Sequence, residues 1–275
     1  MTQHFEVAAG SILGRDHLRV GKNNQDAFSW ISREHVTLAI VCDGCGSGAA
    51  SEVGAQIGAQ LIIEAIAQQL EVFDSIATAD FWRTLHQEVL SRLQSIVLSL
   101  RGPSWQTIRD YLLFTVVGGL ITPETTVVFG LGDGVFALNG EVQTLGPFPD
   151  NAPPYLAYGL TAAAPMEQTP SPLQFQVYRQ IPTDTLESLL LGSDGVADLM
   201  AAAARSLPGS TDTVGPLSQF WQCDRYFANS HAVRRRLALI NREVVRPNWQ
   251  ARQLTRHVGL LPDDTTLVTI RRRSA

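Results

Sequence analysis

Aspartate recurs beside glycine, proline or a turn at the edges of the apolar segments of this sequence. Asp43 ends the run VTLAIVCD, and three glycines follow within five positions. Four further segments have the same pattern: NNQDAF, GLGDG, LLLGSDG and LLPDDTT, which contain Asp26, Asp133, Asp194, Asp263 and Asp264. A single Asp-Gly pair is most often turn chemistry, but five such segments in one chain indicate a shared role.

That role is the binding of cations. Aspartates collected at one edge of a sheet would repel one another and lose hydration, so they persist there when hard cations neutralise them. Oxygen ligands without clusters of histidine or thiolate favour Mg²⁺ or Mn²⁺ over zinc. Neighbouring glycines let a bulky anion approach the backbone. The pattern therefore indicates divalent cations that act on a phosphoryl group.

Strands must position the aspartates, and the hydrophobic pattern predicts where these strands lie. Strands are expected for FEVAAG, VTLAIVCD, YLLFTVVGGLI, TTVVFGLG, GVFALNGEVQTL, LQFQVYRQI, ESLLLGSDG and TTLVTIRR. Asn139-Gly140 predicts a tight hairpin turn, because both positions need positive φ. Antiparallel hairpins with helices before and after them favour an α+β fold over a doubly wound sheet.

Helical periodicity covers residues 51–70 and 80–100, with Ser51 and Asp80 as the expected N-caps. The segment 195–257 is also predicted to be mainly helical. The proline-rich stretch GPFPDNAPPYLAYGL predicts a loop long enough to be functional. No repeat or linker interrupts the pattern, so we expect one domain over residues 1–275.

Composition limits the class of protein. The 275 residues are 45% hydrophobic and 17% charged, which is ordinary for a globular protein, and the net charge of −5 argues against nucleic-acid binding. No stretch reaches the roughly 18 apolar residues of a spanning helix, so no membrane association is expected. No signal peptide is visible, and three cysteines favour a reducing, cytoplasmic location over a disulfide framework.

The order NNQDAF, VCDGCGSGAASEVGA, GLGDGVFAL, LLLGSDGVAD and DDTTLVTI resembles the metal-dependent serine/threonine protein phosphatases of the 2C type, and most closely their bacterial branch with QDA and DGxGS motifs. The resemblance extends from about residue 5 to about residue 270. It implies a four-layer α-β-β-α sandwich with two central antiparallel sheets flanked by helices. It also implies hydrolysis of phosphoserine and phosphothreonine in a protein substrate, and an opposing serine/threonine kinase as a further partner.

The same resemblance implies a role for each aspartate in binding two Mg²⁺ or Mn²⁺ ions, with a third ion in a weaker site. Asp43 would bridge two ions, and the Gly44 carbonyl would bind one of them. Asp194 and Asp263 would bind the other ion, with Asp264 in support.

The resemblance implies two further roles for aspartates, one at the third ion and one at a water molecule. Asp133 and Asp198 match the pair that holds the third ion in bacterial members. Asp26 would hold a water on one of the ions and take part in catalysis. The part of the proline-rich loop from Pro153 to Leu160 is expected to shape the substrate entrance.

The sequence departs from the family pattern at the positions of three charged or titratable groups. Gln25 stands where many members have a glutamate that binds metal, and Cys45 stands where animal members often have a histidine. If Gln25 is a ligand, its metal site carries one negative charge fewer. In the alternative, Gln25 hydrogen-bonds a neighbouring loop and water completes the coordination.

The third departure concerns the phosphate. The usual phosphate-binding arginine falls on Gly21, so Arg15, Arg19 and Lys22 are the candidates to replace it. His17 is a further candidate, as a phosphate donor or an acid. These departures leave two alternatives to a protein phosphatase: a non-catalytic phosphoprotein-binding protein on the same fold, and a phosphatase for small phosphate esters.

Overall fold

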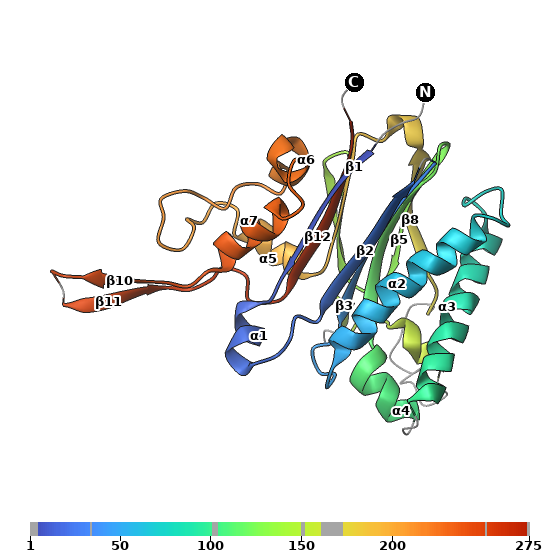
Figure 1. The fold of residues 1–275 in the computed structure, drawn as a ribbon, viewed down its shortest axis with the longest axis horizontal. Coiled ribbons are helices and arrows are strands. Elements are labelled where there is room, and N and C mark those ends of the chain that lie inside the picture. Colours follow the sequence, from blue (N-terminus) through green and yellow to red (C-terminus); the bar gives the residue numbers. More distant parts are fainter. Residues whose placement is uncertain are drawn as a thin grey trace.

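Two antiparallel five-stranded sheets lie face to face at the centre of the computed structural model, which describes residues 5–33, 35–100, 104–149, 152–160, 173–250 and 252–273 (Figure 1). The first sheet has the strand order β1 (Phe5–Ile12), β12 (Thr265–Arg272), β9 (Ser188–Gly192), β6 (Gly134–Leu138) and β7 (Glu141–Leu145). The second has the order β2 (Asp26–Arg33), β3 (Val36–Gly44), β4 (Phe114–Ile121), β5 (Thr125–Leu131) and β8 (Gln176–Pro182).

The strand β4 shows why these apolar runs form the middle of the molecule. All eight of its residues are buried. Because side chains alternate along a strand, Val117 packs toward Leu191 and Val268 of the first sheet, whereas Val116 packs in the cluster beneath the helices. A strand buried on both faces needs a layer on each side, which gives the sandwich.

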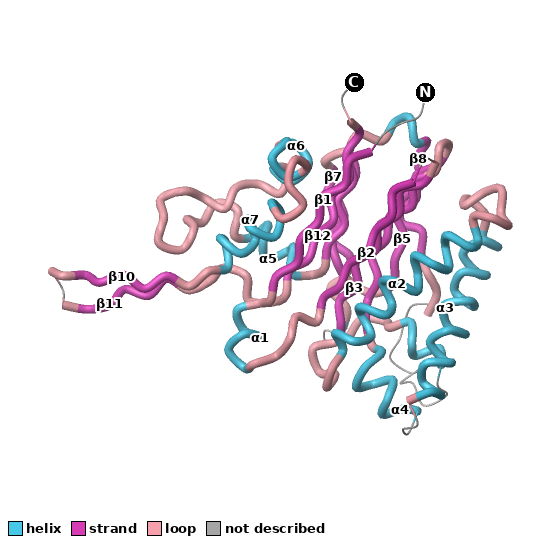
Figure 2. Tube along the Cα trace, viewed as in Figure 1, coloured by secondary structure: helices cyan, strands magenta, loops and turns pink. Residues whose placement is uncertain are grey.

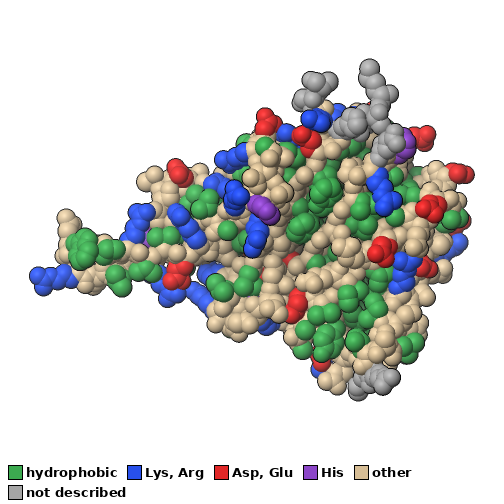
Figure 3. Space-filling view, viewed as in Figure 1, with side chains coloured by type: hydrophobic (Ala, Val, Ile, Leu, Met, Phe, Trp, Pro, Cys, Tyr) green, Lys and Arg blue, Asp and Glu red, His purple; other side chains and the backbone are tan. Residues whose placement is uncertain are grey.

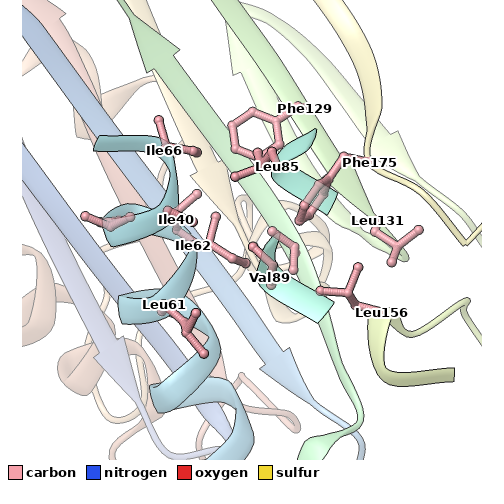
Figure 4. Close-up of a cluster of buried hydrophobic side chains, with 14 of the residues drawn as sticks. Ile40, Leu61, Ile62, Ile66, Leu85, Val89, Phe129, Leu131, Leu156 and Phe175 are labelled. Atoms are coloured by element: carbon pink, nitrogen blue, oxygen red, sulfur yellow. The ribbon is translucent and has the colours of Figure 1, made fainter. Parts of the chain in front are cut away.

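Helices form the two outer layers (Figure 2). They are α2 (Ser51–Gln69) and α3 (Ala79–Ser99) on the second sheet, and α5 (Gly195–Ala201), α6 (Gln219–Gln222) and α7 (Ala232–Asn241) on the first. In Figure 4, Ile62 and Ile66 of α2 and Leu85 and Val89 of α3 converge near Phe129 of β5. The predicted α-β-β-α arrangement is confirmed.

Two glycines bring α2 close to the segment that precedes β4. A Cβ at Gly58 would lie 2.3 Å from the Phe114 ring, and a Cβ at Gly54 would lie 1.9 Å from the Tyr111 carbonyl oxygen. Only a residue without a side chain fits at such distances. The close approach fixes α4 (Ser104–Thr107) and the π-helix η1 (Ile108–Leu112) beside the start of α2.

The other short elements lie at the ends of strands or in connections. They are α1 (Arg15–Val20) and the 3₁₀ helices η3 (Leu156–Leu160), η4 (Thr183–Thr185) and η5 (Asp224–Tyr226). The Asn139-Gly140 turn is confirmed, with φ of 51° and 85°. No helix within the described ranges is long and apolar enough to cross a membrane.

Both expected helix caps are wrong. The N-cap of α2 is Ala50, and the Ser51 hydroxyl instead accepts a hydrogen bond from Gln25 Nε2. The N-cap of α3 is Thr78, whose hydroxyl accepts from the Phe81 backbone N–H. Asp80 lies in the first turn, where it pairs with an arginine. Ala50 makes no side-chain capping bond, and Thr78 lies two positions before the expected Asp80.

The segment 195–257 is less helical than predicted. After three short helices it forms a two-stranded antiparallel sheet, β10 (Val244–Asn248) and β11 (Gln253–His257). Strands of five residues carry little periodicity, and the helical prediction overlooked them. The predicted strand at YLLFTVVGGLI is also shorter, because η1 runs to Leu112 and the strand begins at Phe114.

Candidate active site

Four of the predicted aspartates line one cavity of about 650 Å³ at a single end of the sandwich. Each comes from a different connection: Asp43 from the end of β3, Asp133 from the β5–β6 turn, Asp194 from the turn after β9, and Asp263 from the loop before β12. This end lies beside α1 and α4 (Figure 1), because His17 of α1 and Trp105 of α4 also line the cavity. Antiparallel neighbours bring alternate strand ends to the same edge, so the sheets assemble the carboxylates.

Asp43 lies at the centre of this group. It faces Asp26 directly across the β2–β3 pair. Burial first, and then the negative charges of Asp26 and Asp194, raise the pKa of Asp43 well above its usual value. Asp43 and Asp194 share a hydrogen bond, which requires one of the two carboxyls to keep its proton.

Asp26 is buried, with only 6% of its surface exposed. The Ser193 hydroxyl donates to its Oδ2 at 2.7 Å, whereas its Oδ1 is buried and has no hydrogen-bond partner among the described residues. Burial, followed by the charge of Asp264, raises the pKa of Asp26 to about 8. The carboxyl therefore holds a proton at neutral pH unless a cation compensates its charge.

Asp133 and Asp198 lie at the margin of the group. Asp133 is held in a turn between Gly132 and Gly134, which have φ of 92° and 142°. Burial and then the charge of Asp194 raise the pKa of Asp133 to about 6. Burial, with the charge of Asp263 next, also raises the pKa of Asp198, which projects from α5.

Asp264 accepts hydrogen bonds from segments that adjoin both sheets. Its Oδ1 accepts from the Gly14 backbone N–H, and its Oδ2 accepts from the Gln25 backbone N–H, both at 2.6 Å. His17 Nδ1 lies 3.0 Å from Asp264 Oδ2 and 3.7 Å from Asp263 Oδ1, outside hydrogen-bond geometry. Because backbone donors occupy both oxygens of Asp264, this residue positions the loops around the site.

Gln25 makes the hydrogen bond that the sequence left as its alternative. The side chain is 3% exposed, and its Nε2 donates to the Ser51 hydroxyl at 2.7 Å. Its Oε1 is buried without a hydrogen-bond partner in the described ranges. The Gln25 carbonyl accepts from the Gly44 N–H, so the residue joins the start of β2 to the glycine loop. Its role toward a metal stays a prediction.

The three predicted phosphate-binding cations lie outside the lining of the cavity as the structure describes it. Arg15 donates to Asp16 and to the Gly259 carbonyl, and Arg19 also pairs with Asp16. The Lys22 ammonium donates to the carbonyl of Gly46. Each therefore already has an acceptor within the protein.

A different arginine lines the cavity. Arg109 projects from η1, is 53% exposed, and pairs with Asp110 at 2.9 Å. Trp105, Tyr155 and Tyr158 form an aromatic wall beside it, with the Trp105 and Tyr158 rings stacked at 6.4 Å. The sequence analysis missed Arg109 and Trp105, because neither belongs to a motif and the π-helix that presents Arg109 has no local signal. Tyr155 and Tyr158 lie in the Pro153–Leu160 loop that it expected at the substrate entrance.

The side chains that line the cavity suit hard divalent cations. The carboxylate oxygens that line it come from several elements, and two buried oxygens of residues outside the described lining, Asp26 Oδ1 and Gln25 Oε1, have no donor in the part of the chain that is described. His17, Asp263 and Asp264 also place one ligand atom each within 4.8 Å of one another. Carboxylates this close cannot all be ionised without compensating positive charge, and oxygen donors favour Mg²⁺ or Mn²⁺.

Comparison with known families agrees with this chemistry. The family model described as protein phosphatase 2C matches residues 13–234. The chain belongs to the protein phosphatase 2C family. This phosphatase family is metal-dependent and acts on phosphorylated proteins, as the sequence predicted. The finer assignment to the QDA and DGxGS branch stays a prediction.

Solved structures share the fold of this phosphatase. A bacterial serine phosphatase is 13% identical with a TM-score of 0.51, and the match covers 99% of each chain. The serine-threonine phosphatase 2C of Toxoplasma gondii is 16% identical with a TM-score of 0.53, covering 98% of this chain and 95% of that one. A serine/threonine phosphatase of Staphylococcus aureus is 12% identical with a TM-score of 0.51, covering 100% and 97%. No curated protein matches the sequence.

Proposed function

We propose that this chain is an active protein serine/threonine phosphatase and that the acidic cavity is its active site. The observation that carries the proposal is the convergence of Asp43, Asp133, Asp194 and Asp263 on one cavity from four separate connections. Such a group destabilises a metal-free fold, so its presence is explained best by a function that needs cations.

The proposed ligands follow from this placement. Asp43, which contacts Asp194 and faces Asp26, is the residue suited to bridge two ions, with the Gly44 carbonyl as a further ligand of one. Asp194 and Asp263 hold the other ion, and Asp133 with Asp198 hold a third, weaker one. When bound, Mg²⁺ or Mn²⁺ ions would lower the pKa of a water and offset the charge of the phosphoryl oxygens.

Two residues of the chain are suited to handle protons. Asp26 Oδ2 is fixed by Ser193, and its Oδ1 lacks a donor among the described groups, so Oδ1 can accept a proton from a water beside Asp43. His17 lines the cavity and lies next to Asp263, so it is placed to donate a proton or a hydrogen bond to the phosphate.

Arg109 is the residue we propose to bind the phosphate. It lines the same cavity as the carboxylates and presents a guanidinium that is half exposed, whereas Arg15, Arg19 and Lys22 are not among the residues that the structure places in the lining. A planar guanidinium binds two phosphate oxygens at once. The aromatic wall of Trp105, Tyr155 and Tyr158 would contact the peptide side of the substrate.

The broader setting is proposed on the same basis. Residues 1–275 would act as one phosphatase domain in the cytoplasm, opposed by a serine/threonine kinase. The substrate would reach the cavity past Pro153 and Tyr158 of the proline-rich loop, which lie in its lining.

The test compares hydrolysis of a phosphoserine or phosphothreonine peptide with that of a chromogenic phosphate ester over a range of Mn²⁺ and Mg²⁺ concentrations. We expect turnover that requires the metal and a higher kcat/KM for the phosphopeptides. Asp43→Asn should abolish it without unfolding the protein, because the bridging charge is lost.

The alternatives predict different outcomes. Binding of phosphopeptides without turnover at any metal concentration would support a non-catalytic protein, which Gln25 in place of glutamate favours. Efficient turnover of the small ester alone would support a small-ester phosphatase. Full activity in a folded Asp43→Asn protein would refute the proposed site.

A further inference from the structure

The hairpin β10–β11 belongs to neither of the two central sheets. Its strands pair only with each other within the described chain, and it projects away from the body of the molecule (Figure 1). The family model ends at residue 234, so the hairpin lies outside the region that matches the family. Isolated two-stranded hairpins are marginally stable in water, so this one invites an explanation.

One face of the hairpin is mainly apolar, and its side chains are exposed. The register pairs Val245 with Arg256 and Pro247 with Leu254, which places these four side chains on the same face. Val245 is 51% exposed and Leu254 72%, and Trp249 beyond the end of β10 is 84% exposed. Figure 3 shows hydrophobic side chains at this extremity of the molecule, with basic side chains beside them. Exposed aromatic and aliphatic residues of this kind mark interaction surfaces.

The hairpin also carries a charge opposite to that of the rest of the chain. Residues 242–257 contain four arginines and one glutamate, a net charge of +3 in a chain of net charge −5. At the root of the hairpin, Arg205, Arg246 and His257 line a hollow of about 660 Å³. In the register of the hairpin, Arg246 and His257 lie on the face opposite Val245 and Leu254, so one face is mainly apolar and the other suits a carboxylate.

The root of the hairpin adjoins the candidate active site. The charge of Arg19 in α1 acts on Glu243, and Arg15 of α1 donates to the carbonyl of Gly259, two residues beyond β11. His17 of the same helix lines the catalytic cavity, and Asp263 follows His257 by six residues. A polypeptide that reaches the root of the hairpin would thus lie next to α1, which contributes His17 to the lining of the cavity.

We infer that the hairpin is a docking arm that binds an acidic, partly apolar segment of the phosphoprotein substrate, away from the phosphorylated residue itself. This inference rests on the proposed function. An extended segment that adds to an edge of the hairpin directs alternate side chains to its two faces, so its carboxylates would meet Arg246 while its apolar side chains meet Val245 and Leu254. A lipid surface could use the charges and Trp249 but not the strand edges, which is why we favour a protein segment.

Binding is tested first, without catalysis. The probe is a fluorescein-labelled, unphosphorylated peptide of alternating glutamate with leucine or valine, added to the full chain in EDTA, with a lysine-for-glutamate peptide as its control. We expect binding of the acidic peptide that weakens as salt rises. Arg246→Glu and Trp249→Ala should each weaken it severalfold.

The matched control is Arg83→Glu, because Arg83 is 64% exposed on α3, on the opposite side of the sandwich. It should leave binding unchanged. Equal affinity of the wild type and the hairpin variants for the acidic peptide would overturn the inference. Binding of anionic vesicles through the hairpin without peptide binding would replace it with a membrane role, and self-association lost in Trp249→Ala would replace it with a dimer contact.

Turnover is tested second, with a phosphothreonine peptide made with and without the acidic segment. The segment should raise kcat/KM in the wild type but not in the hairpin variants, and all proteins should hydrolyse the small chromogenic ester equally. Absence of turnover for every ester would refute the proposed function and leave the binding result standing. Equal turnover of the two peptides would overturn the docking arm and leave the active site standing.

Discussion

Asp26→Asn is the substitution that best measures what the buried carboxylates cost the metal-free fold. Asp26 is 6% exposed, and one of its oxygens has no donor in the described structure. Burial, and next the charge of Asp264, raise its pKa from 3.8 to about 8. The amide of asparagine has nearly the same shape but carries no charge, so the variant keeps the packing and removes the titration.

The sign of the effect follows from proton linkage. Between pH 3.8 and about 8 the folded protein holds a proton on Asp26 that the unfolded chain has lost. Stability of the wild type therefore falls as pH rises through this window, by at most about 1.4 kcal/mol per pH unit. The whole shift corresponds to an upper limit of roughly 6 kcal/mol. Asp43 and Asp194 share protons with this site, so one substitution recovers less, roughly 2–3 kcal/mol at pH 8.5 and under about 1 kcal/mol at pH 5.

The assay is urea unfolding in EDTA at several pH values, with the difference between variant and wild type plotted against pH. Asp80→Asn is the control, because Asp80 is 68% exposed on α3 and lies outside the buried cluster. Millimolar Mn²⁺ should reduce or reverse the advantage of Asp26→Asn, since the cation compensates the wild-type charge. A gain that is absent at pH 8.5, or that grows toward pH 5, would refute the reasoning.

Four further substitutions address the ligands and the phosphate. Asp194→Ala and Asp263→Ala should each weaken Mn²⁺ binding strongly while the double variant adds little, because both would serve one ion; unchanged affinity in calorimetry for both single variants would contradict this. Gln25→Glu should lower the Mn²⁺ concentration for half-maximal phosphopeptide hydrolysis, because it adds a charge beside Asp43; an unchanged or higher requirement would mean that residue 25 is not a ligand. Arg109→Ala should lower kcat/KM for the small ester by roughly ten- to hundredfold, with Arg83→Ala as the exposed control; an equal loss in both would argue against phosphate binding.

The sequence could predict the aspartate cluster because each member follows or precedes a long apolar run. Such runs form central strands with little ambiguity, and a sandwich of antiparallel strands necessarily brings their ends together. Asp43 ends β3, and Asp263 lies just before β12, close to where the sequence placed them. The positions of the aspartates and the positions of the predicted strands therefore indicated the same site.

The parts that were missed depend on contacts between distant segments. Arg109 reaches the cavity only because Gly54 lets α2 press against η1, and nothing near residue 109 in the sequence indicates this. The hairpin β10–β11 was taken for helix because its strands are only five residues long. Short elements with weak periodicity are decided by their surroundings, which a single sequence does not contain.

The acidic residues of the site fall into two groups, according to whether backbone N–H groups donate hydrogen bonds to their carboxylates. Asp264 is buried like Asp26, but backbone N–H groups of Gly14 and Gln25 donate to both of its oxygens, and such donors stabilise an ionised carboxylate. The charge of Asp264 in turn raises the pKa of Asp26. The loops that shape the cavity are thus fixed by one acid that needs no metal, while the acids that face the cavity stay costly until a cation binds. Cation binding and fold stability are therefore linked in this phosphatase, and Gln25, which adds no charge of its own, reduces that cost in the metal-free state.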